Sequence, residues 1–117
     1  MIYPEIRNIY SRDLAPPDLP EDPLDCEVVF QAVIGPAEGE GEEAFTFTVI
    51  TPARLARNAD PLWGRGKLIM PAFEWNSVVQ AMAQLLTRCA GPTWNDVAQE
   101  LNKELQWNVD VDEPADA

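Results

Sequence analysis

Two short apolar segments with β-strand patterning flank an acidic, glycine-rich stretch, and this arrangement constrains the fold more than any other feature. Residues 28–34, VVFQAVI, are apolar at six of seven positions and rich in β-branched side chains, which is typical of a buried strand. Residues 45–50, FTFTVI, begin with strict alternation, so the two phenylalanines should share one face and the two threonines the other. An antiparallel hairpin is the simplest pairing of these segments.

The connection predicted between the two strands is unusually long and acidic. Residues 35–44 form a ten-residue link with three glycines and four glutamates, Glu38, Glu40, Glu42 and Glu43. Most hairpin loops have two to five residues, and longer ones are either tolerated insertions or functional loops. The segment can therefore be a solubility device or a docking surface for a basic partner.

The second half of the chain changes to helical periodicity. In residues 75–89 one continuous apolar face is predicted, formed by Trp75, Val78, Val79, Met82, Leu85, Leu86 and Cys89. Gly91 and Pro92 should end this helix. Thr93 should cap a second helix, with Asp96 three residues on as a capping partner. Its apolar stripe is Trp94, Val97, Ala98, Leu101 and Leu105.

The remaining segments are short. Residues 5–11 read as an edge strand, and residues 15–25 as an ordered connector, because their four prolines exclude a helix interior. Thr51 and Pro52 should open a short helical turn. Residues 67–70 form a short strand that Pro71 ends, residues 106–111 could add a last strand, and residues 113–117 read as a frayed tail.

The order of strands followed by helices predicts the fold class. We expect an α+β fold over residues 1–117, with a mostly antiparallel sheet of four to five strands and two C-terminal helices packed on one face. The chain has the length of one ordinary domain. It lacks both a membrane-length apolar run and a basic start followed by an apolar stretch, so a cytoplasmic location is expected.

The formal net charge of −12 restricts the possible partners. It disfavours nucleic-acid phosphates and anionic lipids, which need a positive face, and favours basic proteins. Most of the excess negative charge lies in residues 1–51, which contain eleven acidic and two basic side chains. The candidate partner-binding residues are the loop acids Glu38, Glu40, Glu42 and Glu43, the connector acids Asp18, Glu21 and Asp22, and the loop tryptophan Trp63.

The residues of common active sites are largely missing. There is no histidine, and serine occurs only at positions 11 and 77, outside any nucleophile motif. Cys26 and Cys89 read as reduced core thiols. The acids lie mostly in proline- or glycine-rich loops, and residues 110–113, DVDE, lack the glycine and final glutamate of a calcium loop. We therefore expect no catalytic residue, cofactor or metal; two convergent buried acids in a deep pocket would revive a carboxylate-dependent enzyme.

Several runs together resemble a known family. They are FTFTVITPARLA, GKLIMPAFEWNSVVQ and CAGPTWNDVAQELNKELQWNVD, which begin at Phe45, Gly66 and Cys89. With PEDPLDCEVVFQAVIGP ahead of them, they are similar to the immunity protein 8 family of bacterial toxin–immunity systems. The resemblance implies a small cytoplasmic protein that binds and blocks a cognate toxin. We expect it to be a monomer or weak homodimer. The alternative is a small acidic adaptor or secretion chaperone, which should dimerise and grip an unfolded segment.

Overall fold

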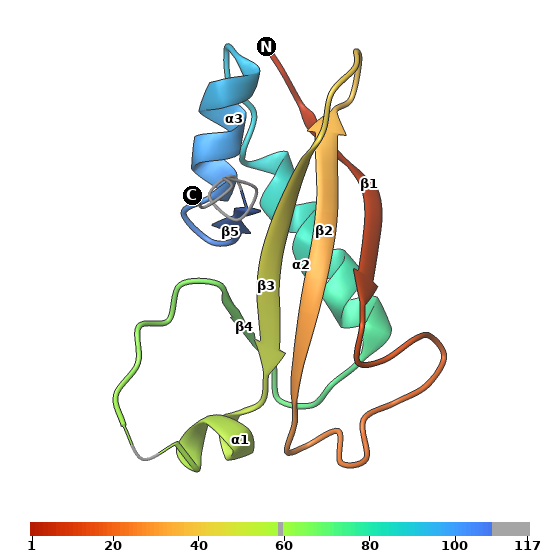
Figure 1. Cartoon of the computed structure of the whole chain (residues 1–117), viewed down its shortest axis with the longest axis vertical. Helices are drawn as coiled ribbons and strands as arrows, with labels where there is room; N and C mark the ends of the chain where they lie inside the picture. The colour runs from red at the N-terminus through yellow and green to blue at the C-terminus, as the bar shows by residue number, and fades with distance from the viewer. Residues whose placement is uncertain (59, 109–117) are drawn as a thin grey trace, which may run out of the picture.

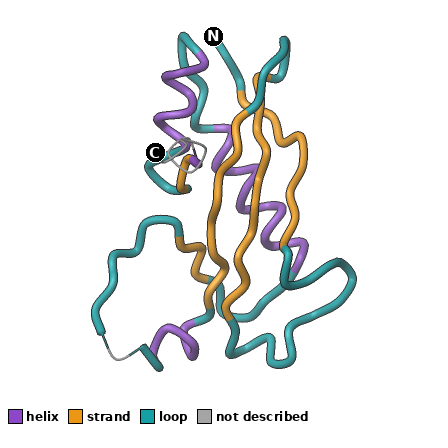
Figure 2. The backbone as a smooth tube through the Cα atoms, in the orientation of Figure 1, coloured by secondary structure: helices purple, strands orange, loops and turns teal. Residues whose placement is uncertain are grey.

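The sheet is built around the predicted hairpin. The computed structural model describes residues 1–58 and 60–108. In it β2 (Glu27–Pro36) pairs antiparallel with β3 (Glu43–Ile50), and Phe30 lies opposite Phe47. The edge strand β1 (Pro4–Ser11) pairs antiparallel with β2, with an irregularity between Ile6 and Asn8. The prediction of an antiparallel hairpin with an edge strand beside it is confirmed (Figures 1 and 2).

Two short strands complete a five-stranded sheet on the free side of β3. β4 (Lys67–Ile69) runs parallel to the end of β3, and β5 (Gln106–Trp107) runs antiparallel to its start. β4 is parallel because the chain leaves the end of β3, and α1 (Pro52–Ala56) and a wide loop carry it back to the level of Thr48, from where it runs in the same direction as β3 (Figure 1). The expected α+β fold with a mostly antiparallel sheet is confirmed.

The two predicted helices form a layer on one side of the sheet. α2 (Trp75–Thr87) lies across this face, and α3 (Trp94–Leu101) packs beside it. Thr93 caps α3 as predicted, because its hydroxyl accepts a hydrogen bond from the Asp96 N–H at 3.1 Å. The predicted face of α2 is wrong at Val79, which is 50% exposed, since only Val78 of this pair turns towards the sheet.

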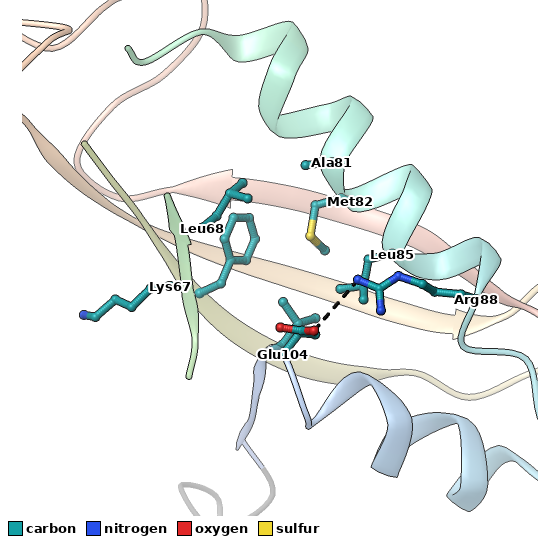
Figure 3. A pocket seen from close by; sticks show the side chains of 9 residues that line it. Lys67, Leu68, Ala81, Met82, Leu85, Arg88 and Glu104 are labelled. Atoms are coloured by element: carbon teal, nitrogen blue, oxygen red, sulfur yellow. Dashed lines mark ion pairs between the residues drawn. The ribbon is translucent and has the colours of Figure 1, made fainter. Parts of the chain in front are cut away.

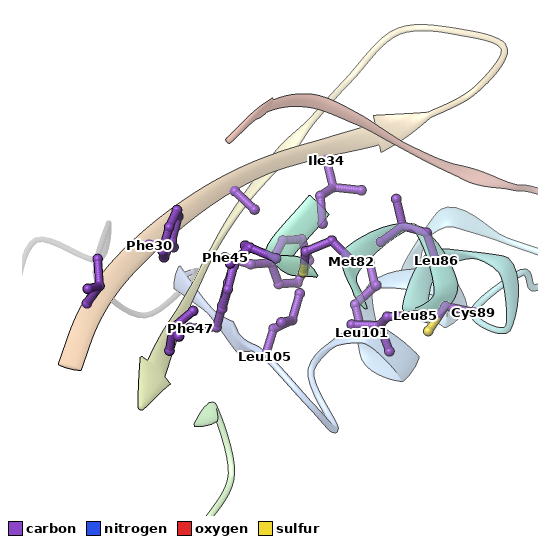
Figure 4. Close-up of a cluster of buried hydrophobic side chains, with 14 of the residues drawn as sticks. Phe30, Ile34, Phe45, Phe47, Met82, Leu85, Leu86, Cys89, Leu101 and Leu105 are labelled. Atoms are coloured by element: carbon purple, nitrogen blue, oxygen red, sulfur yellow. The ribbon is translucent and has the colours of Figure 1, made fainter. Parts of the chain in front are cut away.

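The core lies between this helical layer and the sheet. Alternate residues of β2 and β3 meet the apolar faces of both helices (Figure 4). Phe30 stacks on Phe47 with ring centroids 5.2 Å apart, and Trp75 meets Phe30 edge-on at 5.7 Å. Leu85 and Leu101 are buried as expected, whereas Trp75 is half-buried at the margin. Burying each large apolar side chain contributes about 1.5–3 kcal/mol, so this cluster is the main stabilising feature.

Some sequence predictions were wrong in detail. The hairpin connection spans residues 37–42 and not 35–44, because β2 continues through Pro36 and β3 begins at Glu43. Thr51 precedes α1 as expected but makes no side-chain cap, since its buried hydroxyl bonds to Cys26 instead. Residues 109–117 lie outside the described part, and with them the acidic run 110–113, the tail 113–117 and half of the last predicted strand, 106–111.

On the face of the sheet opposite α2, the side chains in the middle of the strands remain partly exposed, whereas Thr48 and Ile50 at the end of β3 are buried on this face. Side chains directly opposite on paired strands point to the same face. One row across this open face is therefore Tyr10, Gln31 and Thr46, and the row beside it is Asn8, Val33 and Ala44. The prediction of a buried strand at residues 28–34 holds for Val28, Phe30, Ala32 and Ile34, while Val29 is 41% exposed on the open face.

Candidate partner-binding surfaces

Two glycines set the conformation of the acidic hairpin loop. Glu38, Glu40 and Glu42 are all exposed in residues 37–42. The loop turns through Gly39 and Gly41, whose φ angles of 118° and 104° lie in a region that residues with a Cβ rarely adopt. The glycines therefore allow the reversal, and the three carboxylates project into solvent around it.

Contacts from neighbouring strands hold the base of this loop. The Arg7 guanidinium donates hydrogen bonds to the carbonyl oxygens of Pro36 at 2.6 Å and Gly39 at 3.3 Å. Glu43, predicted as the fourth loop acid, belongs instead to β3, and its carboxylate accepts a hydrogen bond from the Trp107 indole N–H at 3.1 Å. This hydrogen bond helps to hold β5 against β3, so the Glu43 carboxylate already has a partner within the fold.

The acidic connector is anchored to the start of α2. Asp18, Glu21 and Asp22 expose their side chains, but the Asp18 carbonyl accepts a hydrogen bond from the Trp75 indole N–H at 2.7 Å. The Asp22 carboxylate caps a turn by accepting from the Leu24 N–H at 3.0 Å. These contacts agree with the expected ordered connector and leave its carboxylates facing water.

Trp63 is the most exposed large apolar side chain of the described residues, at 93%. It lies in the loop between α1 and β4, and Leu62 and Ile69 nearby are 43% and 55% exposed. Tryptophan is enriched among the residues that contribute most to protein interfaces. This exposure leaves Trp63 available to a partner, while its role in binding stays a prediction.

The predicted binding residues do not form one cluster. The loop carrying Glu38, Glu40 and Glu42 stands at one end of β2, at the top of Figure 1, and the connector carrying Asp18 to Asp22 at the other end. The loop of Trp63 lies at that same lower end, on the β4 side. With a rise of about 3.3 Å per residue, a ten-residue strand such as β2 separates its ends by roughly 30 Å.

The open sheet face lies between these two ends and was not among the surfaces predicted from the sequence. A shallow groove of about 520 Å³ runs along it between Tyr10, Val29, Thr46 and Asn108, with Arg12 and Asp13 at its margin. Its floor is fixed by hydrogen bonds: the Asn108 amide donates to the Gln31 side-chain oxygen at 3.1 Å, and the Thr46 hydroxyl lies 2.9 Å from the Asn108 oxygen. The signal in the sequence was the apolar run 28–34, which exceeds what one buried face requires.

A smaller pocket between α2 and β4 does not have the composition of an active site. It has a volume of about 110 Å³ and is lined mainly by apolar side chains such as Leu68, Met82 and Leu85 (Figure 3). Arg88 and Glu104 form an ion pair of 3.8 Å at its margin, and both are more than half exposed. Pockets for small molecules usually have volumes of about 300–1,000 Å³. This pocket has one carboxylate, whereas the carboxylate-dependent enzyme requires two convergent buried acids.

The cysteines and the acidic side chains give no sign of a reactive centre. Cys26 and Cys89 are both free and buried, as expected for reduced core thiols, and burial raises the pKa of each thiol. Nearby Asp22 and Asp25 raise the pKa of Cys26 further. Among residues 1–58 and 60–108 no group of three or more Cys, Asp or Glu side chains is arranged to hold a metal ion. None of the helices in this part of the chain is long and apolar enough to cross a membrane.

The fold and its surfaces are those of a small acidic α+β protein with one covered and one open sheet face. A family model described as Immunity protein 8 matches residues 5–111. The chain therefore belongs to the immunity protein 8 family, and the resemblance noted in the sequence is confirmed. No curated protein and no solved structure matches it.

Proposed function

We propose that this protein neutralises a cognate bacterial toxin domain by binding it in the cytoplasm as a folded monomer, without catalysing a reaction. The observation that carries the proposal is membership of an immunity protein family over residues 5–111. An immunity protein protects the cell that makes the toxin, so tight and selective binding is the property that its surface must supply.

The charge of the surface supports a basic toxin domain as the partner. No basic side chain in the described part of the chain forms an ion pair with Asp18, Glu21, Asp22, Glu38, Glu40 or Glu42. These carboxylates remain available to a partner, and the net charge of −12 attracts a positive one over a longer range. Complementary charge raises association rates well above the roughly 10⁵–10⁶ M⁻¹s⁻¹ of neutral pairs.

The chemistry of the chain supports inhibition by binding. The absence of histidine removes the commonest general base of enzymes. The groove on the open sheet face contains one carboxylate, from Asp13, at its margin. A protein that blocks a toxin needs surface complementarity and no reactive group, and the residues available here meet that requirement.

The test begins with the genes beside the one for this protein: a large secreted protein encoded there would supply its C-terminal domain as the candidate toxin. Expression of that domain should stop growth, and co-expression of this protein should restore it. The purified pair should form a one-to-one complex with the folded toxin domain by calorimetry and light scattering. Failure to protect and to bind would refute the proposal, while a dimer that binds only unfolded segments would identify a secretion chaperone.

A further inference from the structure

β2 has the apolar sequence of a strand that is buried on both faces. The helical layer, however, covers only one face of the sheet. Antiparallel strands with one solvated face usually alternate apolar and polar residues, whereas strands buried on both faces read as continuous apolar runs. β2 has Val28, Phe30, Ala32 and Ile34 in the core and places Val29 and Val33 on the open face. The apolar residues on the open face are unexplained by the packing of the described chain.

The middle of the open face has the composition of an interface centre. Its two rows, Tyr10–Gln31–Thr46 and Asn8–Val33–Ala44, contain no charged side chain. Val29 lies in the next row, opposite Thr48, where the uncharged strip ends at Lys67, Arg12 and Asp13. Tyr10 and Val29 are 40% and 41% exposed, and the hydrogen bonds among Gln31, Thr46 and Asn108 hold the polar groups between them in place. Interface centres are depleted in charge and enriched in aromatic residues, and a fixed surface loses less entropy on binding.

Acidic side chains stand at both ends of this uncharged strip. Glu38, Glu40 and Glu42 lie beyond one end of β2, and Asp18, Glu21 and Asp22 beyond the other. An interface of ordinary size buries about 800 Å² on each partner, which corresponds to a patch roughly 30 Å across. That width is close to the length of β2, so one partner seated on the open face could extend along the whole strand to the acidic loop, whereas the connector at the other end is anchored to Trp75 of α2.

We propose that the open sheet face, centred on Val29, Gln31 and Tyr10, is the surface on which a basic, folded toxin domain docks. This inference rests on the proposed function and adds to it the surface that binds the toxin domain. The uncharged strip becomes the buried centre of the complex, and the acidic loop meets basic side chains at its margin. Trp63, in the loop beside β4, lies outside the strip.

The experiment measures the affinity of the full-length protein for the inactivated neighbouring toxin domain by calorimetry. Val29→Lys introduces a positive charge into the strip, and Val79→Lys is its matched control, because Val79 is 50% exposed on α2, on the other side of the sheet. Tyr10→Ala is a second variant that adds no charge to the strand, with Val79→Ala on α2 as its control. Urea unfolding establishes that every variant is folded.

Val29→Lys and Tyr10→Ala should each weaken binding about tenfold or more, while both controls stay within about twofold of the parent. If the two strip variants bind like the parent and Trp63→Ala does not, the docking site is wrong and the proposed function stands. If Val29→Lys instead dissolves a homodimer and leaves toxin binding unchanged, a second copy covers the face and the inference is overturned. If the parent itself neither binds nor protects, the proposed function fails and the inference fails with it.

Discussion

Thr51 and Cys26 are joined by hydrogen bonds that tie the end of β3 to the start of β2. The Thr51 hydroxyl accepts from the Cys26 N–H at 3.0 Å, and the Thr51 N–H donates to the Cys26 carbonyl at 3.1 Å. Thr51 is fully buried, so water cannot replace its hydroxyl. The pair closes the hairpin where the chain leaves the sheet for α1.

Removal of this hydroxyl should destabilise the fold. Thr51→Val keeps the volume but leaves the buried Cys26 N–H without its acceptor, and an unsatisfied buried donor costs about 1–3 kcal/mol. Thr51→Ser is the control, because it retains the acceptor. Urea unfolding should show a clearly larger loss for Thr51→Val, and equal stability of the two variants would contradict the role given to the hydroxyl.

Leu85 on α2 should be a strong contributor to stability. Leu85→Ala removes a buried side chain from the cluster between α2 and the sheet, and such truncations cost about 2–5 kcal/mol. Val79→Ala on the same helix should change stability by only about 0.5 kcal/mol or less, because Val79 is half exposed. Chemical denaturation of both variants measures the difference, and a loss of a few tenths for Leu85→Ala would show that the helix packs differently.

Stability should fall at alkaline pH through the buried thiol of Cys26. Burial, then Asp22 and Asp25, raise its pKa above the ordinary value of 9.0, against the opposing effect of Arg54. The unfolded chain therefore loses the thiol proton at a lower pH than the folded chain, so this contribution is complete below the ordinary pKa and is lost as pH rises beyond it. The free energy of unfolding of the parent should fall more steeply above about pH 9 than that of Cys26→Ala. Parallel pH profiles of the two proteins would contradict the assignment.

The acidic loop should affect association more than stability. Changing Glu38, Glu40 and Glu42 together to glutamine should leave unfolding nearly unchanged, because exposed carboxylates contribute little to folding. Glu43 is left in place because it bonds to Trp107. The triple variant should bind the toxin domain more slowly and with a weaker salt dependence, since charge steering is screened over about 8–10 Å.

Stopped-flow kinetics at low and moderate salt measure this effect. The matching triple change to aspartate is the control, because it keeps the charge while shortening the side chains. If the glutamine variant associates as fast as the parent at both salt concentrations, the loop serves solubility alone.

Much of the fold could be predicted because it depends on local patterns. The period of two in residues 45–50 and the helical spacing from Trp75 to Leu86 identify the elements, and Thr93 with Asp96 marks the start of α3. A local pattern identifies which residues share a face of an element. It was therefore reliable for the hairpin, for both long helices and for the free cysteines.

The candidate site was less predictable, because its members come from distant parts of the chain. The eight residues proposed from charge and exposure fall at separate places, with the acids at opposite ends of β2 and Glu43 inside β3. The open face between them is formed by three strands, and no single segment contains its pattern. Only Val29 and Val33, which share a face of β2 on either side of Gln31, indicated it.

The sequence by itself determined the charge, the lack of histidine, the identity of the strands and helices, and the family resemblance, because each is a property of composition or of neighbouring residues. Tertiary structure decided which face of the sheet α2 covers, the parallel direction of β4, and the exposure of Val79 beside buried Val78. These depend on contacts between elements far apart in the chain. Local periodicity specifies that a strand has two faces, and only the packing of the whole molecule determines which of them remains open.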